Sequence, residues 1–276
     1  MKIFLGPAGI PTVAEDRTTE GGIKKVFELG LNAMEIEFVR NVYLDQKKAE
    51  EVGKFAKELG ISLTVHAPYF INLLSDNKTT VEASKKRILE SLDRAERMEA
   101  KAVVVHAAYY GNLPREEAFE KMVEITKEIL EEARERGIKK TLLAYETMAK
   151  ESQFAGLDEL LELMKKVNSK QFTINVDFAH IFVRNNGKID YGKILEKLKN
   201  FDHIYSHFSN VKYNVNTKRF ADVHVPLNSH PAFKPLAEEI LKKKVNITII
   251  SESPILEQDS LKMLQVFKKL ESKFKL

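Results

Sequence analysis

The chain alternates short runs of apolar, often β-branched residues with longer segments in which apolar residues recur every three or four positions. The short runs are typical of buried strands and the longer segments of amphipathic helices. Strands are predicted at 2–5, 33–38, 61–66, 101–106, 141–146, 171–177, 203–207 and 245–252. Helices are predicted at 20–29, 45–59, 79–99, 115–136, 157–167, 190–199, 232–243 and 259–273. The pattern therefore predicts eight consecutive βα units.

Several helix boundaries carry residues that favour them. Gly30, Gly60 and Gly137 stand just after periodic segments, where glycine commonly ends a helix. Pro114 opens the fourth helix, and two glutamates follow it near the positive end of the helix dipole. These signals support the predicted division of the chain.

Eight βα units in 276 residues match the usual length of an α/β barrel. An open doubly wound sheet would normally carry a glycine-rich phosphate loop after its first strand. Residues 6–11 (GPAGIP) contain glycine and proline but lack that spacing. Because no linker or low-complexity segment interrupts the chain, we expect residues 1–276 to form a single (β/α)8 TIM-barrel domain.

The composition limits which partners and which cellular compartment are expected. The 44 basic and 40 acidic residues give a net charge of +4, so an anionic partner would have to meet a local patch. The absence of cysteine excludes disulfides and thiolate metal sites, and we expect a cytoplasmic protein. No apolar run suggests a signal peptide or a membrane span, and no feature implies an obligate protein partner.

Residues that can bind metals follow the predicted strands with unusual regularity. The last six strands end at or beside a histidine or an acid, namely His66, His106, Glu146, Asp177, His207 and Glu252. Three more candidates lie just beyond two of these strands, namely His180, Asp222 and His224. In a barrel the C-terminal strand ends meet on one face, where active sites are built. We therefore expect a metal site on that face.

A single histidine or carboxylate at a strand end is most often a structural, hydrogen-bonded residue. Nine together would concentrate buried charge at high cost, which divalent cations would remove. Mixed imidazole and carboxylate ligands favour Zn²⁺, with Mn²⁺ or Fe²⁺ as alternatives, and roughly two to three ions per chain are expected. His203 starts its strand and is expected to be structural, and His230 is expected to help start a helix.

Four segments that carry these residues resemble the endonuclease IV family of apurinic/apyrimidinic endonucleases. Residues 66–73 (HAPYFINL) are similar to that family's His-x-x-Tyr-x-Ile-Asn-Leu segment. Residues 177–180 (DFAH) resemble its Asp-x-x-His, residues 222–224 (DVH) its Asp-Arg-His, and residues 252–254 (ESP) its Glu-Thr-Pro ending. The resemblance extends over essentially the whole chain and includes all nine candidate ligands.

The resemblance implies a cluster of zinc ions that hydrolyses the DNA backbone 5′ to an abasic site and leaves a 3′-hydroxyl. His66 and His106 would hold one ion, which Glu146 would bridge to a second. The remaining ligands would be Asp177, His207 and Glu252 for the second ion and His180, Asp222 and His224 for the third. Glu146 and Glu252 would be the catalytic residues. Clustered metals of this kind stabilise both the attacking and the leaving oxygen.

The resemblance also implies damaged double-stranded DNA as the partner. Tyr69 matches a residue that inserts into the damaged duplex, and Asn72 belongs to the same segment. Arg40 and Tyr43 lie near the place where the family's second βα loop bears an arginine that enters the DNA. We expect these four residues to contact DNA.

The chain departs from the family at several loops. The family's Gly-x-His near the first strand is replaced by residues 6–8 (GPA), and the asparagine after the bridging glutamate is Thr147. The family's Gly-Glu-Gly-x-x-Gly stretch is replaced by residues 225–230 (VPLNSH). The metal ligands therefore match better than the DNA-contacting loops do.

Two other functions remain compatible with these residues. A sugar isomerase or epimerase of the xylose-isomerase-like barrels would use a single metal, held by Glu146, Asp177, His207 and Glu252. The other five candidate ligands would then have no necessary role. A nucleic-acid-binding homologue that has lost catalysis would retain a costly cluster of buried charge without using it. The nuclease hypothesis is favoured.

Overall fold

The computed structural model describes the backbone of residues 1–274 and the side chains of residues 1–271. The chain packs into two compact units. Unit 1 consists of Met1–Met34 and Val176–Leu276, and unit 2 of Glu35–Asn175. Two strands, β2 (Ala33–Glu37) and β8 (Phe172–Asp177), pass from one unit to the other.

Unit 2 is built on parallel strands that alternate with helices. Besides the parts of β2 and β8, it contains β3 (Ser62–His66), β4 (Ala102–Val105) and β6 (Leu142–Glu146). The register pairs His66 with Val104 and Val103 with Leu143, so β3, β4 and β6 end at nearly the same level. The C-terminal ends of these three strands therefore share one edge.

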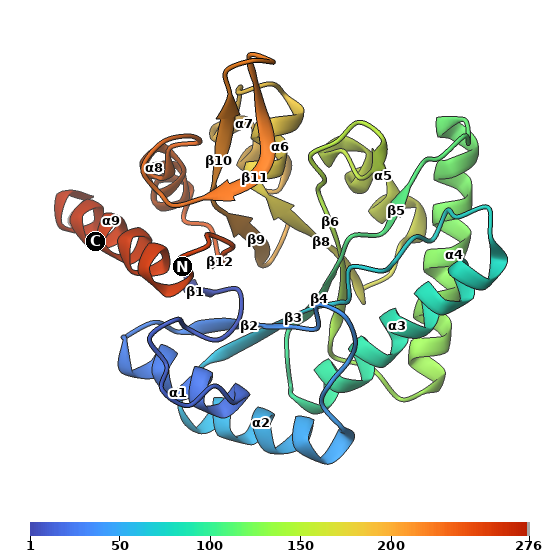
Figure 1. Cartoon of the computed structure of the whole chain (residues 1–276), viewed down its shortest axis with the longest axis horizontal. Coiled ribbons are helices and arrows are strands. Elements are labelled where there is room, and N and C mark those ends of the chain that lie inside the picture. Colours follow the sequence, from blue (N-terminus) through green and yellow to red (C-terminus); the bar gives the residue numbers. More distant parts are fainter. Residues whose placement is uncertain (275–276) are drawn as a thin grey trace. The chain divides into compact units, whose positions relative to one another are not determined.

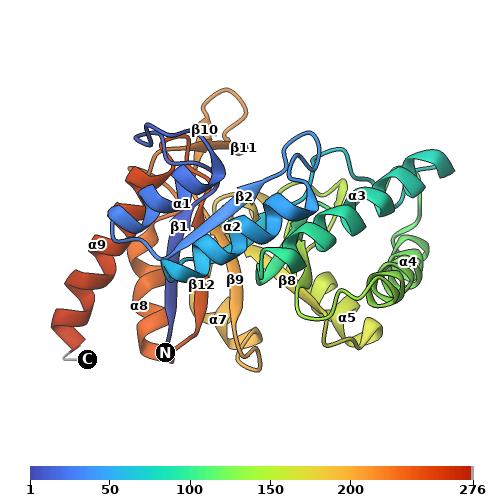
Figure 2. The same cartoon turned by 90° about the horizontal axis from the view of Figure 1, so that it is seen from below.

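The helices of unit 2 follow its strands in sequence. They are α2 (Gln46–Glu58), α3 (Lys78–Arg97), α4 (Arg115–Glu135) and α5 (Leu157–Val167). Consecutive helices contact one another, and Figures 1 and 2 show α3 beside α4. Asp45 and Asn77 cap α2 and α3 by accepting hydrogen bonds from backbone amides in the first turn. A short antiparallel pair, β5 (Ala108–Tyr109) and β7 (Gln153–Phe154), joins two loops.

Unit 1 contains three further parallel strands, with β12 (Ile247–Ser251) between β1 (Ile3–Pro7) and β9 (Ile204–Phe208). Gly6 in β1 is required by close packing, because a Cβ atom there would lie 1.6 Å from the carbonyl oxygen of Ala33. The helices are α1 (Thr19–Glu28), α6 (Phe178–Arg184), α7 (Tyr191–Lys197), α8 (Phe233–Lys243) and α9 (Glu257–Phe274).

An antiparallel hairpin leaves the end of β9 in unit 1. Its strands are β10 (Asn210–Asn214) and β11 (Arg219–Val225), and it packs against α6 (Figure 1). Phe182 of α6 and Phe220 of β11 meet with ring centroids 4.6 Å apart, in a small core with Val211. The hairpin is thus held by its own apolar contacts.

Each predicted strand and helix has a counterpart within a few residues, but three features were not predicted. They are the β5–β7 pair, helix α6 and the β10–β11 hairpin. His180 therefore lies in a helix, and Asp222 and His224 lie in a strand rather than in a loop. No helix within residues 1–274 is both long enough and apolar enough to cross a membrane.

Candidate metal centre

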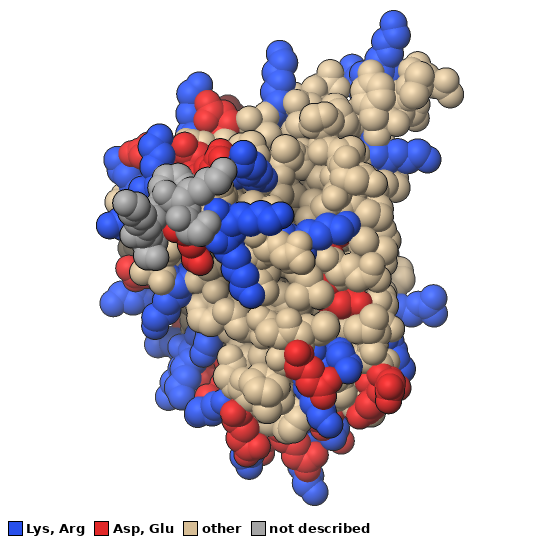
Figure 3. Space-filling view, turned by 90° about the vertical axis from the view of Figure 1, so that its left-hand side faces the viewer, with Lys and Arg blue, Asp and Glu red and all other residues tan. Residues whose placement is uncertain are grey.

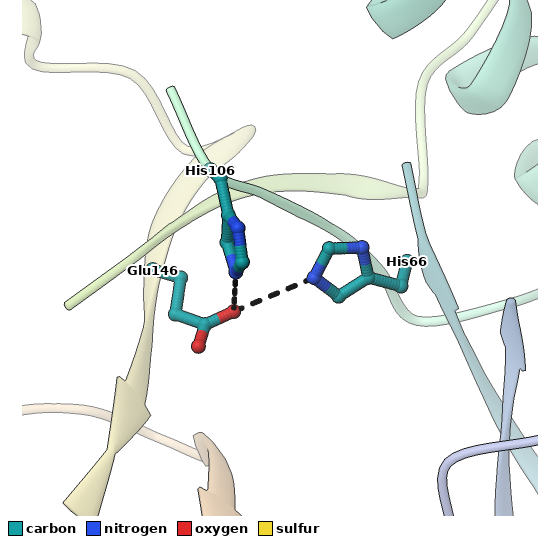
Figure 4. Close-up of side chains that lie close together, drawn as sticks. All are labelled: His66, His106 and Glu146. Carbon is teal, nitrogen blue, oxygen red and sulfur yellow. Dashed lines mark ion pairs between the residues drawn. The ribbon is translucent and has the colours of Figure 1, made fainter. Parts of the chain in front are cut away.

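Unit 2 brings together His66, His106 and Glu146, here called the two-histidine cluster. His66 is the last residue of β3, Glu146 is the last residue of β6, and His106 directly follows β4. Figure 4 shows both imidazoles directed at one carboxylate oxygen of Glu146. That oxygen, Oε2, lies 3.6 Å from His66 Nε2 and 3.3 Å from His106 Nε2. The three strand ends thus place three metal-binding side chains around one point.

These distances fit a shared divalent cation. Two atoms that each lie about 2.1 Å from a tetrahedral zinc ion are about 3.4 Å apart. His66 donates from Nδ1 to the carbonyl oxygen of Ala67 at 2.8 Å, which orients the ring and presents Nε2 to Glu146. His66 and Glu146 are buried, and the His106 side chain is 27% exposed. The residues present therefore suit a metal ion with one side open to solvent.

Negative charge dominates the surroundings of His66. Burial by itself would lower the pKa of the His66 imidazole. Hydrogen bonding to Glu146 and the charges of Glu37, Glu35 and Glu146 outweigh burial and raise this pKa to about 10. The cluster therefore favours a positive charge, whether proton or metal.

Glu35 and Glu37 are site residues that the sequence did not reveal. Both lie in β2, where Glu35 is fully buried and accepts a hydrogen bond from Thr64 at 2.8 Å. Their alternation in residues 33–38 (AMEIEF) was the available signal. Such alternation usually indicates a strand face in water, whereas here it supplies acid next to His66.

Unit 1 holds the other six candidate ligands, here called the six-ligand cluster: Asp177, His180, His207, Asp222, His224 and Glu252. His207 Nδ1 lies 3.3 Å from Glu252 Oε1, and Glu252 Oε2 lies 3.8 Å from His224 Nδ1. His180 Nε2 lies 3.2 Å from Asp222 Oδ1, and His224 Nε2 lies 4.0 Å from the same oxygen. Short distances between imidazole and carboxylate groups thus connect these five residues in one chain.

Asp177 joins this cluster through helix α6. Its Oδ1 accepts a hydrogen bond from the backbone amide of His180 at 2.7 Å and so caps the helix, while Oδ2 lies 3.7 Å from His180 Nδ1. Asp177, His180 and His224 offer ligand atoms within 4.8 Å of one another, and so do Asp177, His207 and Glu252. The donor set of unit 1 is therefore sufficient for two cations with mixed nitrogen and oxygen ligands.

Of the four residues expected to contact DNA, three are exposed near the two-histidine cluster. Tyr69 is 47% exposed, and its ring lies 5.2 Å from the His66 ring and 5.8 Å from the His106 ring. Tyr43 is 50% exposed and packs against Phe38, and Arg40 is also exposed. These side chains are accessible to a large ligand.

Asn72 has a structural task in the same region. Its side-chain oxygen accepts hydrogen bonds from the backbone amides of Tyr109 and Leu74. Its backbone N–H donates to Ser84 Oγ. It thereby ties the loop after β3 to the loop after β4. A DNA contact by Asn72 stays a prediction.

The two remaining histidines lie outside both clusters. His203 precedes β9, bonds to Thr248 Oγ1 at 2.8 Å and packs against Phe4 and Tyr205, which agrees with the expected structural role. His230 does not start a helix, because α8 begins three residues later, and its ring instead stacks on Phe182. Among the residues that the structure describes, neither histidine belongs to a group that could hold a metal ion.

Comparison with known proteins gives the family. A family model described as a xylose isomerase-like TIM barrel matches residues 23–270. An uncharacterized protein of Methanocaldococcus jannaschii is 29% identical, with 97% of this chain and 98% of the relative covered. A probable endonuclease 4 of Mycoplasmopsis synoviae is 26% identical, with 76% of each chain covered.

Solved structures of two kinds of enzyme share the fold about equally well. A D-tagatose 3-epimerase-like protein has a TM-score of 0.71 and 22% identity, with 98% of this chain and 96% of that chain covered. Endonuclease IV from Thermus thermophilus has a TM-score of 0.70 and 18% identity, with 97% and 99% covered. The expected (β/α)8 barrel is confirmed, and the chain belongs to the xylose isomerase-like TIM-barrel family.

Proposed function

We propose that this chain is a divalent-metal-dependent phosphodiesterase that incises DNA 5′ to abasic sites, with zinc as its metal. The observation that carries the proposal is the surplus of ligands in unit 1. Asp177, His207 and Glu252 already supply the ligands that a one-metal sugar epimerase would take from this unit. The additional presence of His180, Asp222 and His224 favours a site with several metals, as clustered hydrolytic centres have.

The relatives support the same choice. The probable endonuclease 4 of Mycoplasmopsis synoviae matches over three quarters of its length, so the likeness extends well beyond single motifs. Seven of the nine candidate ligands lie at or just beyond the C-terminal ends of strands, where the active sites of TIM barrels are built, and Asp222 and His224 lie in hairpin strand β11. We propose that both clusters serve hydrolysis.

The protein's own residues would hold and orient the reacting groups. When bound, clustered divalent ions supply Lewis acidity and a nucleophile at neutral pH. Glu146 fixes the two imidazoles of the two-histidine cluster, and Glu252 contacts both His207 and His224. Tyr69 presents an exposed ring beside the cluster, on which a base next to the lesion can stack.

An incision assay tests the proposal. A fluorescein-labelled duplex with one abasic site and the matching intact duplex are incubated with zinc-loaded protein and with chelator-stripped protein. We expect cleavage of the abasic duplex alone, only with metal, and a product that DNA polymerase extends from its 3′-hydroxyl. A panel of ketoses is tested in parallel. Epimerisation of a ketose without any incision would contradict the proposal and favour the epimerase hypothesis.

A further inference from the structure

The two faces of the β10–β11 hairpin differ in character. Phe220, Asp222 and His224 alternate along β11 and therefore lie on the same face of the strand. Phe220 packs on α6, and the other two belong to the six-ligand cluster. Arg219 and Val223 alternate with them on the opposite face, where both are exposed. The hairpin thus carries metal ligands on one face and a solvent-facing surface on the other.

The exposed parts of the hairpin are positively charged. Lys212 lies in β10, Lys218 in the turn and Arg219 at the start of β11, and all three are exposed. None of them forms an ion pair with any residue that the structure describes, whereas lysines in and just after α7, such as Lys193 and Lys199, contact carboxylates. At the top right of Figure 3, where the hairpin projects, basic side chains stand without acidic neighbours.

Within residues 210–225 the sequence has one acid, Asp222, and it belongs to the six-ligand cluster. All charged residues on the exposed surface of the hairpin are therefore cationic, and this surface attracts anions. Its turn is also ordered, because Asn214 Oδ1 accepts hydrogen bonds from the amides of Asn216 and Thr217. Tyr213 is 47% exposed and rests on Phe220, with ring centroids 5.0 Å apart.

We propose that this hairpin is a clamp for the sugar–phosphate backbone of nucleic acid, in which Lys212, Lys218 and Arg219 bind phosphates beyond the one that is cut. The inference rests on the proposed nuclease function. Lys218 is four residues from Asp222, which is about 13 Å along an extended strand. Phosphates of one strand follow each other by about 3.4 Å along the duplex axis, so that distance spans roughly four nucleotides. A monosaccharide is too small to reach from the cluster to this lysine.

The test compares two variants with the same loss of charge. In the hairpin variant Lys212, Lys218 and Arg219 are each changed to Ala. In the control variant the three changes to Ala are Lys193 on α7, Lys199 in the turn after α7, and Lys242 on α8. Binding of a fluorescein-labelled intact duplex of 25 base pairs is measured by anisotropy across a series of KCl concentrations. The intact duplex isolates backbone contacts from incision.

Each phosphate contact contributes about 0.9 to the slope of log affinity against log salt concentration. We expect the hairpin variant to lose roughly 2.7 from the magnitude of that slope and to bind at least about tenfold more weakly at low salt. The control variant should keep the wild-type slope. Metal content and single-turnover incision at saturating protein should match the wild type in both variants.

Three results would overturn the inference. If the hairpin variant keeps the wild-type slope while the wild type binds DNA, the clamp is refuted and the proposed function stands. If both variants lose the same amount of salt dependence and affinity, the loss comes from the change in net charge and not from the hairpin. If the wild type binds no duplex, the clamp and the proposed function fall together. If the hairpin Ala variant loses metal, a second variant with Gln at the same three positions is compared with the wild type. Gln removes the charge but keeps a longer side chain than Ala.

Discussion

Glu146 is the residue on which the two-histidine cluster depends, because its buried carboxylate contacts both imidazoles. Glu146→Gln keeps the shape but removes the charge that the imidazoles and a metal would need. We expect incision to fall by roughly 100-fold or more, since loss of even outer partners of metal ligands costs 10- to 100-fold. Incision rate, metal content and circular dichroism are measured together. A folded Glu146→Gln protein that cuts at the wild-type rate would show that Glu146 has no catalytic role.

Tyr69 tests recognition separately from catalysis. Its exposed ring lies against both histidines, so Tyr69→Ala should remove a stacking surface and leave the ligands in place. We expect affinity for an abasic duplex to weaken by about 1–3 kcal/mol, with unchanged metal content. Tyr109→Ala, which removes a ring of similar exposure, serves as the control. Equal losses of affinity for abasic and intact duplex would exclude a lesion-specific role for Tyr69.

Gly6 tests the packing of β1. A methyl group at this position would overlap the carbonyl oxygen of Ala33, and backbone has to move to relieve the overlap. We expect Gly6→Ala to reduce the free energy of unfolding by about 1–3 kcal/mol in chemical denaturation. In Gly192→Ala the new methyl would lie 3.2 Å from the end of the flexible Glu239 side chain and 3.5 Å from Asp190 Oδ1, an ordinary contact distance, so that variant should keep wild-type stability. Equal stability of the two variants would argue against the close approach of β1 to Ala33.

At the residue scale, the sequence predicted which candidate ligands end the strands, but it did not predict which other residues lie around them. Strand ends could be predicted because apolar runs stop at them, as at His66 and Glu146. Glu35 was missed because alternating acids usually mark a solvent-facing strand, whereas a parallel strand can be covered on both faces. Asp177 caps helix α6 as well as being a candidate ligand, and spacing alone does not predict the side-chain geometry of that cap.

At the element scale the β10–β11 hairpin was the main omission. Only two of the twelve residues in its strands are buried, so it lacks the run of buried apolar residues by which strands are predicted. Helix α6 was missed because its apolar residues run on directly from β8 without a break. Both elements carry candidate metal ligands, so the proposed function depends on their local folding.

The hairpin also supplies the element-scale test of the metal site. Asp222→Ala with His224→Ala removes two ligands from one strand, and we expect the loss of one metal equivalent and most of the incision. The reason is lost stabilisation of charge on the phosphate oxygens, which commonly costs several kcal/mol of barrier. Val223→Ala, on the opposite exposed face of β11, is the matched control. A double variant that keeps full metal content would contradict the assignment of these two ligands.

At the scale of the whole molecule, the repeat of eight βα units was sufficient to predict the barrel, because the strand–helix alternation is regular. Function could not be predicted from the fold, since an epimerase-like protein and an endonuclease IV have nearly equal TM-scores. The prediction that residues 1–276 form one domain stays a prediction.

The charge around His66 predicts opposite effects of pH on stability and on metal binding. Its pKa is raised to about 10 in the folded protein, so its contribution to metal-free stability is full below about pH 6.5 and is lost as pH rises towards 10. Metal binding displaces this proton, and we expect apparent zinc affinity to rise by about tenfold per pH unit below that pKa. Chelator competition at pH 6.5 and 7.5 measures the change. An affinity that does not depend on pH would show that His66 is not a ligand.

The central claim, a hydrolytic site with several metals, is tested most directly by the metal content of protein purified without chelator. Elemental analysis by mass spectrometry, normalised to protein concentration, gives the number of ions per chain. Nine ligands in two clusters lead us to expect roughly two to three divalent ions, mainly zinc, as in clustered metal sites. One ion per chain, or none, would contradict the account and favour the epimerase hypothesis or a loss of catalysis.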